Sequence, residues 1–148
     1  MATIREMLNR TIQAKEGIEP AMMKIVSDLS EKIIDLNRMG QLFMGENTKG
    51  QIIGRYSEAT EKQYGGAAKG KFAGDPYNFE DTGDFFKAFT LDFKNGKLDI
   101  FSTDSKVPLL TEKYDNLFGL NWENEMELNY EIIKPELLKF IKRVLYKG

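Results

Sequence analysis

The sequence contains no cysteine and no histidine among its 148 residues. Disulfide bonds and thiol chemistry are therefore excluded, and cysteine usage says nothing about the redox compartment. A transition-metal site would lack its usual nitrogen and sulfur ligands, and the commonest general acid and base of enzymes is missing. An enzyme would have to use carboxylates, lysine or tyrosine. We therefore predict a protein that is not an enzyme and that has no cofactor, metal ion or catalytic residue.

The sequence also lacks a strong excess of charge and a long apolar run. Its net charge of -2 and isoelectric point near 5.3 create no basic field that would collect nucleic acid. No run approaches the ~18 apolar residues of a membrane span, and the start "MATIREMLNR" lacks the apolar core of a signal peptide. We expect a protein that is made in the cytosol, is not exported by a cleaved signal, and has no membrane partner.

The residues that are present indicate a folded protein. Hydrophobic residues make up 41% of the chain, and ten phenylalanines and six tyrosines can supply a sizeable core. The length suits one domain over residues 1–148. The pattern of elements described below predicts an α+β fold, with N-terminal helices, a small antiparallel sheet and C-terminal helices.

Two helices are predicted at the N-terminus. Thr3 and Glu6 form a capping-box pattern, and this first helix should end near Gly17. Pro20 occupies the first position of the second helix, which Gly40 closes. The second helix carries a stripe of apolar residues that we interpret as a core face, or as a contact with another subunit: Met22, Val26, Leu29, Ile33, Leu36 and Met39.

A β-hairpin over residues 89–103 is the clearest element in the sequence. Asn95 and Gly96 are the preferred pair for a two-residue hairpin turn, and apolar residues alternate on both sides of them. A lone hairpin is marginally stable, so one or two more strands should join it, from residues 45–80 or from another copy. The turn predicts the pairs Lys94–Lys97, Phe93–Leu98, Leu91–Ile100 and Phe89–Ser102.

Capping signals mark the remaining helices. Asp81 or Thr82, followed by Gly83, should cap a short helix with Asp84 in its first turn. Phe85, Phe86 and Phe89 should then enter the core.

Another helix should start at Pro108 and end at Gly119. Asn121 should cap the last helical segment, in which Met126, Tyr130 and Ile133 keep helical phase, and Pro135 either kinks that segment or starts a new helix. Trp122 should be a core or interface anchor.

Residues 45–80 form a loosely patterned segment rich in Gly, Lys, Ala and Thr. A loop of this length inside a compact domain is uncommon, and such loops are usually functional or disordered. We predict a projecting loop, which we call the arm. The residues expected to contact another subunit are Arg55, Tyr56, Tyr64, Lys69, Lys71 and Phe72.

Two short motifs resemble catalytic signatures. The stretch "GGAAKGKF", residues 65–72, approaches a phosphate-binding loop, but Phe72 stands where that loop needs Ser or Thr. Polar residues precede it and helix breakers follow it, so we interpret it as a flexible segment. "DTG" at residues 81–83 resembles an aspartic-protease motif, but Glu80 and Asp84 flank it with extra carboxylates. A carboxylate-based enzyme is the hypothesis that these motifs would support.

The stretch from Ile52 to Thr103 resembles the head–tail connector and tail-completion proteins of tailed phages, also called virion morphogenesis proteins. The likeness lies in "IGRYS" at residues 53–57, the Lys/Gly-rich residues 65–74, "FEDTGDFFKAF" at residues 79–89, and the hairpin that follows. The C-terminal stretch "YDNLFGLNWENEMELNYEIIKPELLKFIKRVL" is similar to the same proteins. Ala88, where Ser is common, and Phe79, in place of an aliphatic residue, depart from the pattern.

This resemblance implies a non-catalytic subunit of a ring that joins the phage head and tail. It implies a homo-oligomer that is made in the host cytoplasm and located in the virion, with other neck, portal or tail proteins as partners. Nucleic acid would be present only as DNA passing through the ring lumen. The alternative is a small cytosolic binding module, such as an adaptor or inhibitor, that grips another protein with the arm.

Overall fold

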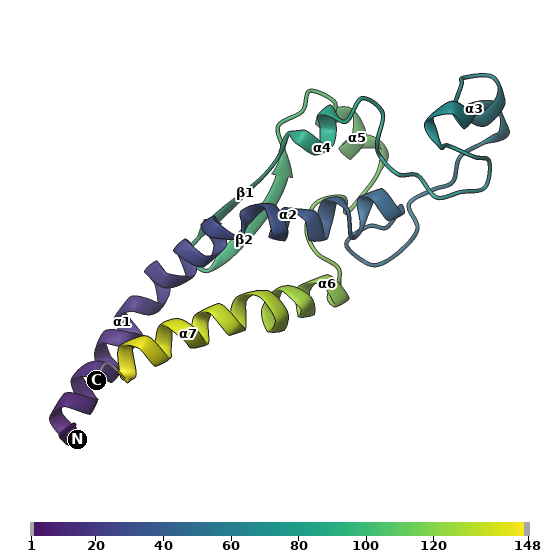
Figure 1. Ribbon diagram of the computed structural model, residues 1–148. Coiled ribbons are helices and arrows are strands. Elements are labelled where there is room, and N and C mark those ends of the chain that lie inside the picture. Colours follow the sequence, from purple (N-terminus) through teal and green to yellow (C-terminus); the bar gives the residue numbers. More distant parts are fainter. Residues whose placement is uncertain (1, 147–148) are drawn as a thin grey trace.

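Two antiparallel helices form the long axis of the molecule in the computed structural model, which describes residues 2–146 (Figure 1). Helix α1 (Ile4–Asp28) runs away from the N-terminal end, and α7 (Lys134–Leu145) returns to it. The guanidinium of Arg10 donates a hydrogen bond to the carbonyl of Leu145 at 3.3 Å. The fold is α+β, as predicted, with helices at both ends of the chain and a two-stranded antiparallel sheet between them.

Helix α1 is continuous through Gly17 and Pro20, so the predicted division into two helices at these residues is wrong. The Thr3–Glu6 capping box is present, as predicted. Gly17 permits a close approach of α7, since a Cβ there would lie 2.8 Å from Cζ of Phe140. The helix is interrupted at Leu29 instead, after which α2 (Ser30–Arg38) begins. Packing against α7 thus outweighs the local tendency of Gly and Pro to end the helix.

The predicted hairpin is confirmed in its position and register. Strand β1 (Phe89–Lys94) pairs with β2 (Lys97–Ser102), and all four predicted residue pairs are present. Asn95 and Gly96 have φ angles of 52° and 73°, the left-handed conformation that this turn type requires. One face of the hairpin is buried or half-buried through Phe89, Leu91, Phe93, Leu98 and Ile100.

The expected third strand is absent from residues 2–146. Residues 45–80 contribute only two isolated bridges, Glu46–Ile52 and Arg55–Pro76, and neither joins the hairpin. The apolar face of the hairpin is covered by helices instead, chiefly where β1 packs against α2. A strand from another copy stays a prediction.

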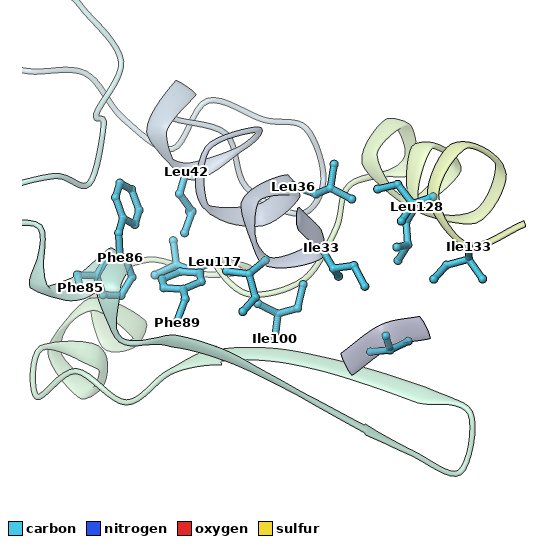
Figure 2. Packing of buried hydrophobic residues seen from close by; sticks show 13 residues of the cluster. Ile33, Leu36, Leu42, Phe85, Phe86, Phe89, Ile100, Leu117, Leu128 and Ile133 are labelled. Carbon is cyan, nitrogen blue, oxygen red and sulfur yellow. The ribbon is translucent and has the colours of Figure 1, made fainter. Parts of the chain in front are cut away.

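The core lies between α2, the hairpin and the C-terminal helices (Figure 2). Ile33 and Leu42, from α2 and the following turn η1 (Leu42–Met44), are fully buried. Helix α4 (Asp84–Lys87) buries Phe85 and Phe86 there, as predicted, and Phe89 stacks edge-on against Phe85 with ring centroids 5.1 Å apart.

Two buried amide side chains hold the loop that enters the C-terminal helices. Asn37 and Gln41 are fully buried, and neither was singled out by the sequence. Asn37 bonds the carbonyl of Leu117 and the N–H of Gly119, both at 3.0 Å. Gln41 bonds the carbonyl of Gly119 at 3.0 Å and the N–H of Asn121 at 2.8 Å. Both amide side chains therefore have hydrogen-bond partners from a distant part of the chain.

Helix α5 (Val107–Lys113) has Pro108 in its first turn, as predicted. It ends well before Gly119, so the predicted C-cap at that glycine is wrong. Asn121 caps α6 (Trp122–Glu127) as predicted, with its side chain accepting from Asn124 N–H at 2.9 Å. The chain stays helical through a wider π-helical turn, η3 (Leu128–Ile133), into α7.

The π-helical turn changes the phase of the C-terminal helices. Leu128, Ile132 and Ile133 are buried, whereas Tyr130 is 53% exposed, against prediction. Trp122 is 72% exposed, so its interpretation as a core residue is wrong and only the interface interpretation stays open. A π-helical turn accommodates an extra residue, and that residue rotates the buried face.

Candidate functional site at the root of the arm

The arm, residues 45–80, projects from the end of the molecule that lies away from the termini (Figure 1). The two chain segments that enter and leave the arm, residues 54–56 and 75–77, pair with each other, and we call this paired part the root of the arm. Tyr56 N–H donates to the carbonyl of Asp75 at 2.9 Å, and Tyr77 N–H donates to that of Gly54 at 3.0 Å. Gly54 allows this pairing because a Cβ there would collide with the ring of Tyr77. The arm is therefore a folded projection rather than an unstructured loop.

The outer part of the arm is also held by its own hydrogen bonds. Ser57 caps the short helix α3 (Glu58–Lys62), and its Oγ accepts a hydrogen bond from Thr60 N–H at 3.2 Å. The carboxylate of Glu61 accepts from Ala73 N–H at 2.7 Å across the arm. These contacts leave the side chains of Tyr64 and Phe72 exposed, at 76% and 47%.

Four of the six predicted interface residues help to build the arm or join it to the rest of the chain. The guanidinium of Arg55 donates to the carbonyl of Gly74 at 2.8 Å. Lys69 pairs with Asp81 at 3.0 Å. The Lys71 ammonium lies 5.8 Å from the ring centroid of Tyr56. Tyr64 and Phe72 face solvent, and their contact with another subunit stays a prediction.

Tyr56 is the central side chain of the arm's root. Its hydroxyl donates to Oδ1 of Asn78 at 2.8 Å and accepts from the N–H of the same residue at 2.9 Å. Burial raises the pKa of the Tyr56 phenol, and the backbone hydrogen bond from Asn78 opposes that rise. The neutral phenol is thus the form that this site holds.

A cleft of about 380 Å³, which we call the arm-root cleft, lies between the root of the arm, the segment before α4, and α5. Five aromatic residues line it, namely Tyr56, Tyr77, Phe79, Phe85 and Tyr114. Tyr77 makes edge-to-face contacts with Tyr56 and Tyr114, with ring centroids 5.0 and 5.9 Å apart, and Phe79 lies 5.7 Å from Tyr114. Phe79 has a φ of 55°, a left-handed conformation that is rare for an aromatic residue and turns the chain into the cleft.

The charged side chains around the arm-root cleft are mostly basic. Lys71, Lys106 and Lys113 line it, together with the acidic residues Glu80 and Asp81. Lys69 lowers the pKa of the Asp81 carboxyl by hydrogen bonding and by its charge, and the charges of Lys71 and Lys106 lower it further. The lysines come from segments that are far apart in the sequence, so no local motif revealed this cluster.

The predicted capping by Asp81 is wrong. Gly83, with a φ of 86°, takes the N-cap position of α4. The Oγ1 of Thr82 accepts from Asp84 N–H at 3.4 Å, which is a weak contact. The Asp81 carboxylate instead accepts a hydrogen bond from the ammonium of Lys69. Asp81 thus joins the arm to the segment before α4.

Residues 65–72 do not form a phosphate-binding loop. A short helix, α3, precedes them where a buried strand would be required. The 3-10 turn η2 (Ala67–Lys69) lies inside the stretch, and a turn follows it in place of a helix. The interpretation of this stretch as a flexible segment is also incomplete, since Gly66 is buried and its N–H donates to the carbonyl of Thr60 at 2.8 Å.

No group of three or more acidic side chains within residues 2–146 is arranged to hold a metal ion. Over the same residues, no helix has both the length and the apolar composition needed to span a membrane. No protein-family model, curated protein or solved structure matches this chain.

Proposed function

We propose that this chain is a virion structural protein, a non-enzymatic subunit of a neck, connector or tail-completion ring that joins the head and tail of a tailed phage. The family resemblance of residues 52–103 and of the C-terminal stretch supports this proposal. Within it, the chain is made in the host cytoplasm and assembles with copies of itself and with neighbouring neck, portal or tail proteins.

The observation that carries the proposal is the folded arm. Hydrogen bonds within the arm satisfy its polar groups, as at Arg55–Gly74 and Glu61–Ala73. Its aromatic side chains Tyr64 and Phe72 are 76% and 47% exposed. Aromatic residues dominate the binding energy of many interfaces, so a preorganised projection that exposes them is suited to contact another subunit.

A second exposed apolar surface supports a ring in particular. The first turns of α1 expose four apolar residues at the end of the molecule opposite the arm, namely Ile4, Met7, Leu8 and Ile12 (Figure 1). A subunit that binds its neighbours through two different surfaces associates head to tail, and such contacts form a ring when the rotation closes. DNA would pass through the lumen of that ring.

Self-association of the purified chain tests the proposal directly. Sedimentation velocity over a wide range of concentrations, with negative-stain microscopy of the largest species, should reveal closed rings. Mass spectrometry of purified tailed-phage particles should detect peptides of this chain. A chain that remains monomeric at every concentration and is absent from particles would overturn the proposal, and a stable complex with an unrelated cytosolic protein would then favour the binding module.

A further inference from the structure

We infer that the arm-root cleft receives Trp122 and its neighbouring glutamates from a second copy of this chain. The inference rests on the proposed function, because it assigns the two surfaces that would meet in the ring. This pair of surfaces would meet in addition to the exposed Tyr64 and Phe72 of the arm and the start of α1.

One surface is the helical segment 121–133, which we call the acidic ridge. It contains no lysine or arginine and four glutamates, Glu123, Glu125, Glu127 and Glu131. All four side chains are exposed, and within residues 2–146 none of them forms an ion pair. This is the most acidic segment of helix in the molecule, and nothing in the described chain neutralises it.

The acidic ridge also carries an exposed aromatic side chain, Trp122, which a purely solvated acidic face would not need. Its side chain is 72% exposed at the start of α6, directly beside Glu123. Tryptophan is the largest side chain in the sequence, and it gains most when it leaves water. A pocket with aromatic walls and basic residues at its edge would suit an exposed indole next to glutamates.

The arm-root cleft has those two properties. Tyr56, Tyr77 and Tyr114 supply aromatic walls, and the volume of about 380 Å³ accommodates one indole ring. The ammonium of Lys113 lies 5.3 Å from the ring centroid of Tyr114, and that of Lys71 lies 5.8 Å from that of Tyr56. An indole entering the cleft would meet aromatic edges and cations, both of which favour its π face.

The charges of the two surfaces are complementary. Three lysines, Lys71, Lys106 and Lys113, line the arm-root cleft with Glu80 and Asp81, and Asp81 is already paired with Lys69. Opposite charges across an interface steer association and fix the register of the partners. The same lysines and rings would also suit a nucleobase with its phosphate, but the chain as a whole is acidic, with a net charge of -2.

Trp122 must come from another copy. Helices α6 and α5 lie on opposite sides of α2 (Figure 1), and the cleft is lined by residues of α5 and not by Trp122. Since the two surfaces lie on different sides of one subunit, their contact is heterologous and repeats from copy to copy.

Cysteine cross-linking tests this pairing with little background, because the natural chain has no cysteine. Lys113→Cys and Glu123→Cys are made in separate full-length chains, mixed and oxidised. Disulfide formation between the two variants should exceed that of either variant alone. Lys97→Cys, at the exposed hairpin turn, mixed with Glu123→Cys is the matched control. Adding Trp122→Ala to the Glu123→Cys chain should reduce cross-linking to the level of that control.

Charge reversal provides the second measurement. The double variants Lys106→Glu/Lys113→Glu and Glu123→Lys/Glu127→Lys should each weaken self-association by about tenfold or more, since like charges then meet at the interface. An equimolar mixture of the two should recover association. Lys94→Glu/Lys97→Glu changes the net charge equally at the hairpin turn, outside the cleft, and should leave association unchanged.

The outcomes separate the inference from the proposed function. Rings that persist in both charge-reversed variants, without preferential cross-linking, would overturn the inference and leave the ring proposal standing. Preferential cross-linking with charge-swap recovery, in a chain that forms only open filaments and is absent from particles, would support the inference and overturn the ring. Binding of a single-stranded oligonucleotide that Lys106→Glu/Lys113→Glu abolishes, with no cross-linking between copies, would also overturn the inference.

Discussion

The backbone N–H of Gly119 donates a hydrogen bond to Oδ1 of Asn37 at 3.0 Å, although the two residues lie 82 positions apart. The Nδ2 of Asn37 donates to the carbonyl of Leu117 at 3.0 Å. This fully buried amide therefore holds the loop between α5 and α6 against α2. The loop in turn sets where α6 and its exposed Trp122 begin.

Replacing Asn37 should destabilise the whole fold. Asn37→Leu leaves the carbonyl of Leu117 and the N–H of Gly119 buried without partners, and each such group costs about 1–3 kcal/mol. We expect a loss of about 2–4 kcal/mol in the free energy of unfolding, measured by urea denaturation. Asn9→Leu, at an exposed position of α1, is the control. Equal losses in the two variants would show that the buried amide does not stabilise the loop.

Gly17 and Phe140 control the packing of α1 on α7. Gly17→Ala should gain up to about 1 kcal/mol from helix propensity, but the new Cβ would lie 2.8 Å from the ring of Phe140, which has to move. The substitution should therefore stabilise the protein less in the natural chain than in a Phe140→Ala background. A double-mutant cycle from thermal unfolding measures this difference. If Gly17→Ala has the same effect in both backgrounds, the helices do not meet closely at this point.

Asp81 should titrate below its ordinary pKa of 3.8 because Lys69, Lys71 and Lys106 favour its charged form. Since the folded state lowers this pKa, the Lys69–Asp81 pair stabilises the fold above the ordinary pKa, and that contribution is lost as pH falls through the lowered value. Lys69→Met should raise the pKa of Asp81 while leaving it below the ordinary value, because the other two lysines remain. NMR titration of the Asp81 carboxyl carbon measures the shift, and an unchanged pKa in Lys69→Met would contradict the pairing.

The sequence predicted best those elements whose causes are local. The Asn95–Gly96 turn and the alternation around it specified the hairpin register, and Asn121 and Thr3 capped the helices expected of them. The expected helix end at Gly17 failed because the reason for that glycine is a ring in α7, more than a hundred residues later. The third strand failed for a similar reason, since α2 covers the apolar face that a strand was expected to complete.

The candidate site was less accessible to sequence reasoning. Tyr56, Lys71 and Asp81 were singled out, but Tyr77, Lys106 and Tyr114 gave no signal because folding alone brings them into the arm-root cleft. Trp122 shows the converse, because its large aromatic side chain suggested a core or interface position, whereas it is 72% exposed. Asn37 and Gln41 follow an apolar stripe in the sequence, where a polar residue would be expected to face solvent. Their burial is explained only by their hydrogen-bond partners at residues 117–121.

The hydroxyl of Tyr56 should control how often the arm opens. Tyr56→Phe removes both hydrogen bonds to Asn78, each of which contributes about 1 kcal/mol net. Because these bonds lie between the two segments that enter and leave the arm, their loss should promote local opening there without unfolding the core. Hydrogen exchange followed by mass spectrometry should show faster exchange in residues 54–78, while α1 and α7 keep their rates. Tyr64→Phe removes an exposed hydroxyl from the same arm and should leave exchange unchanged. If Tyr56→Phe accelerates exchange equally in α7, the arm does not open independently, and the root holds the fold together as a whole.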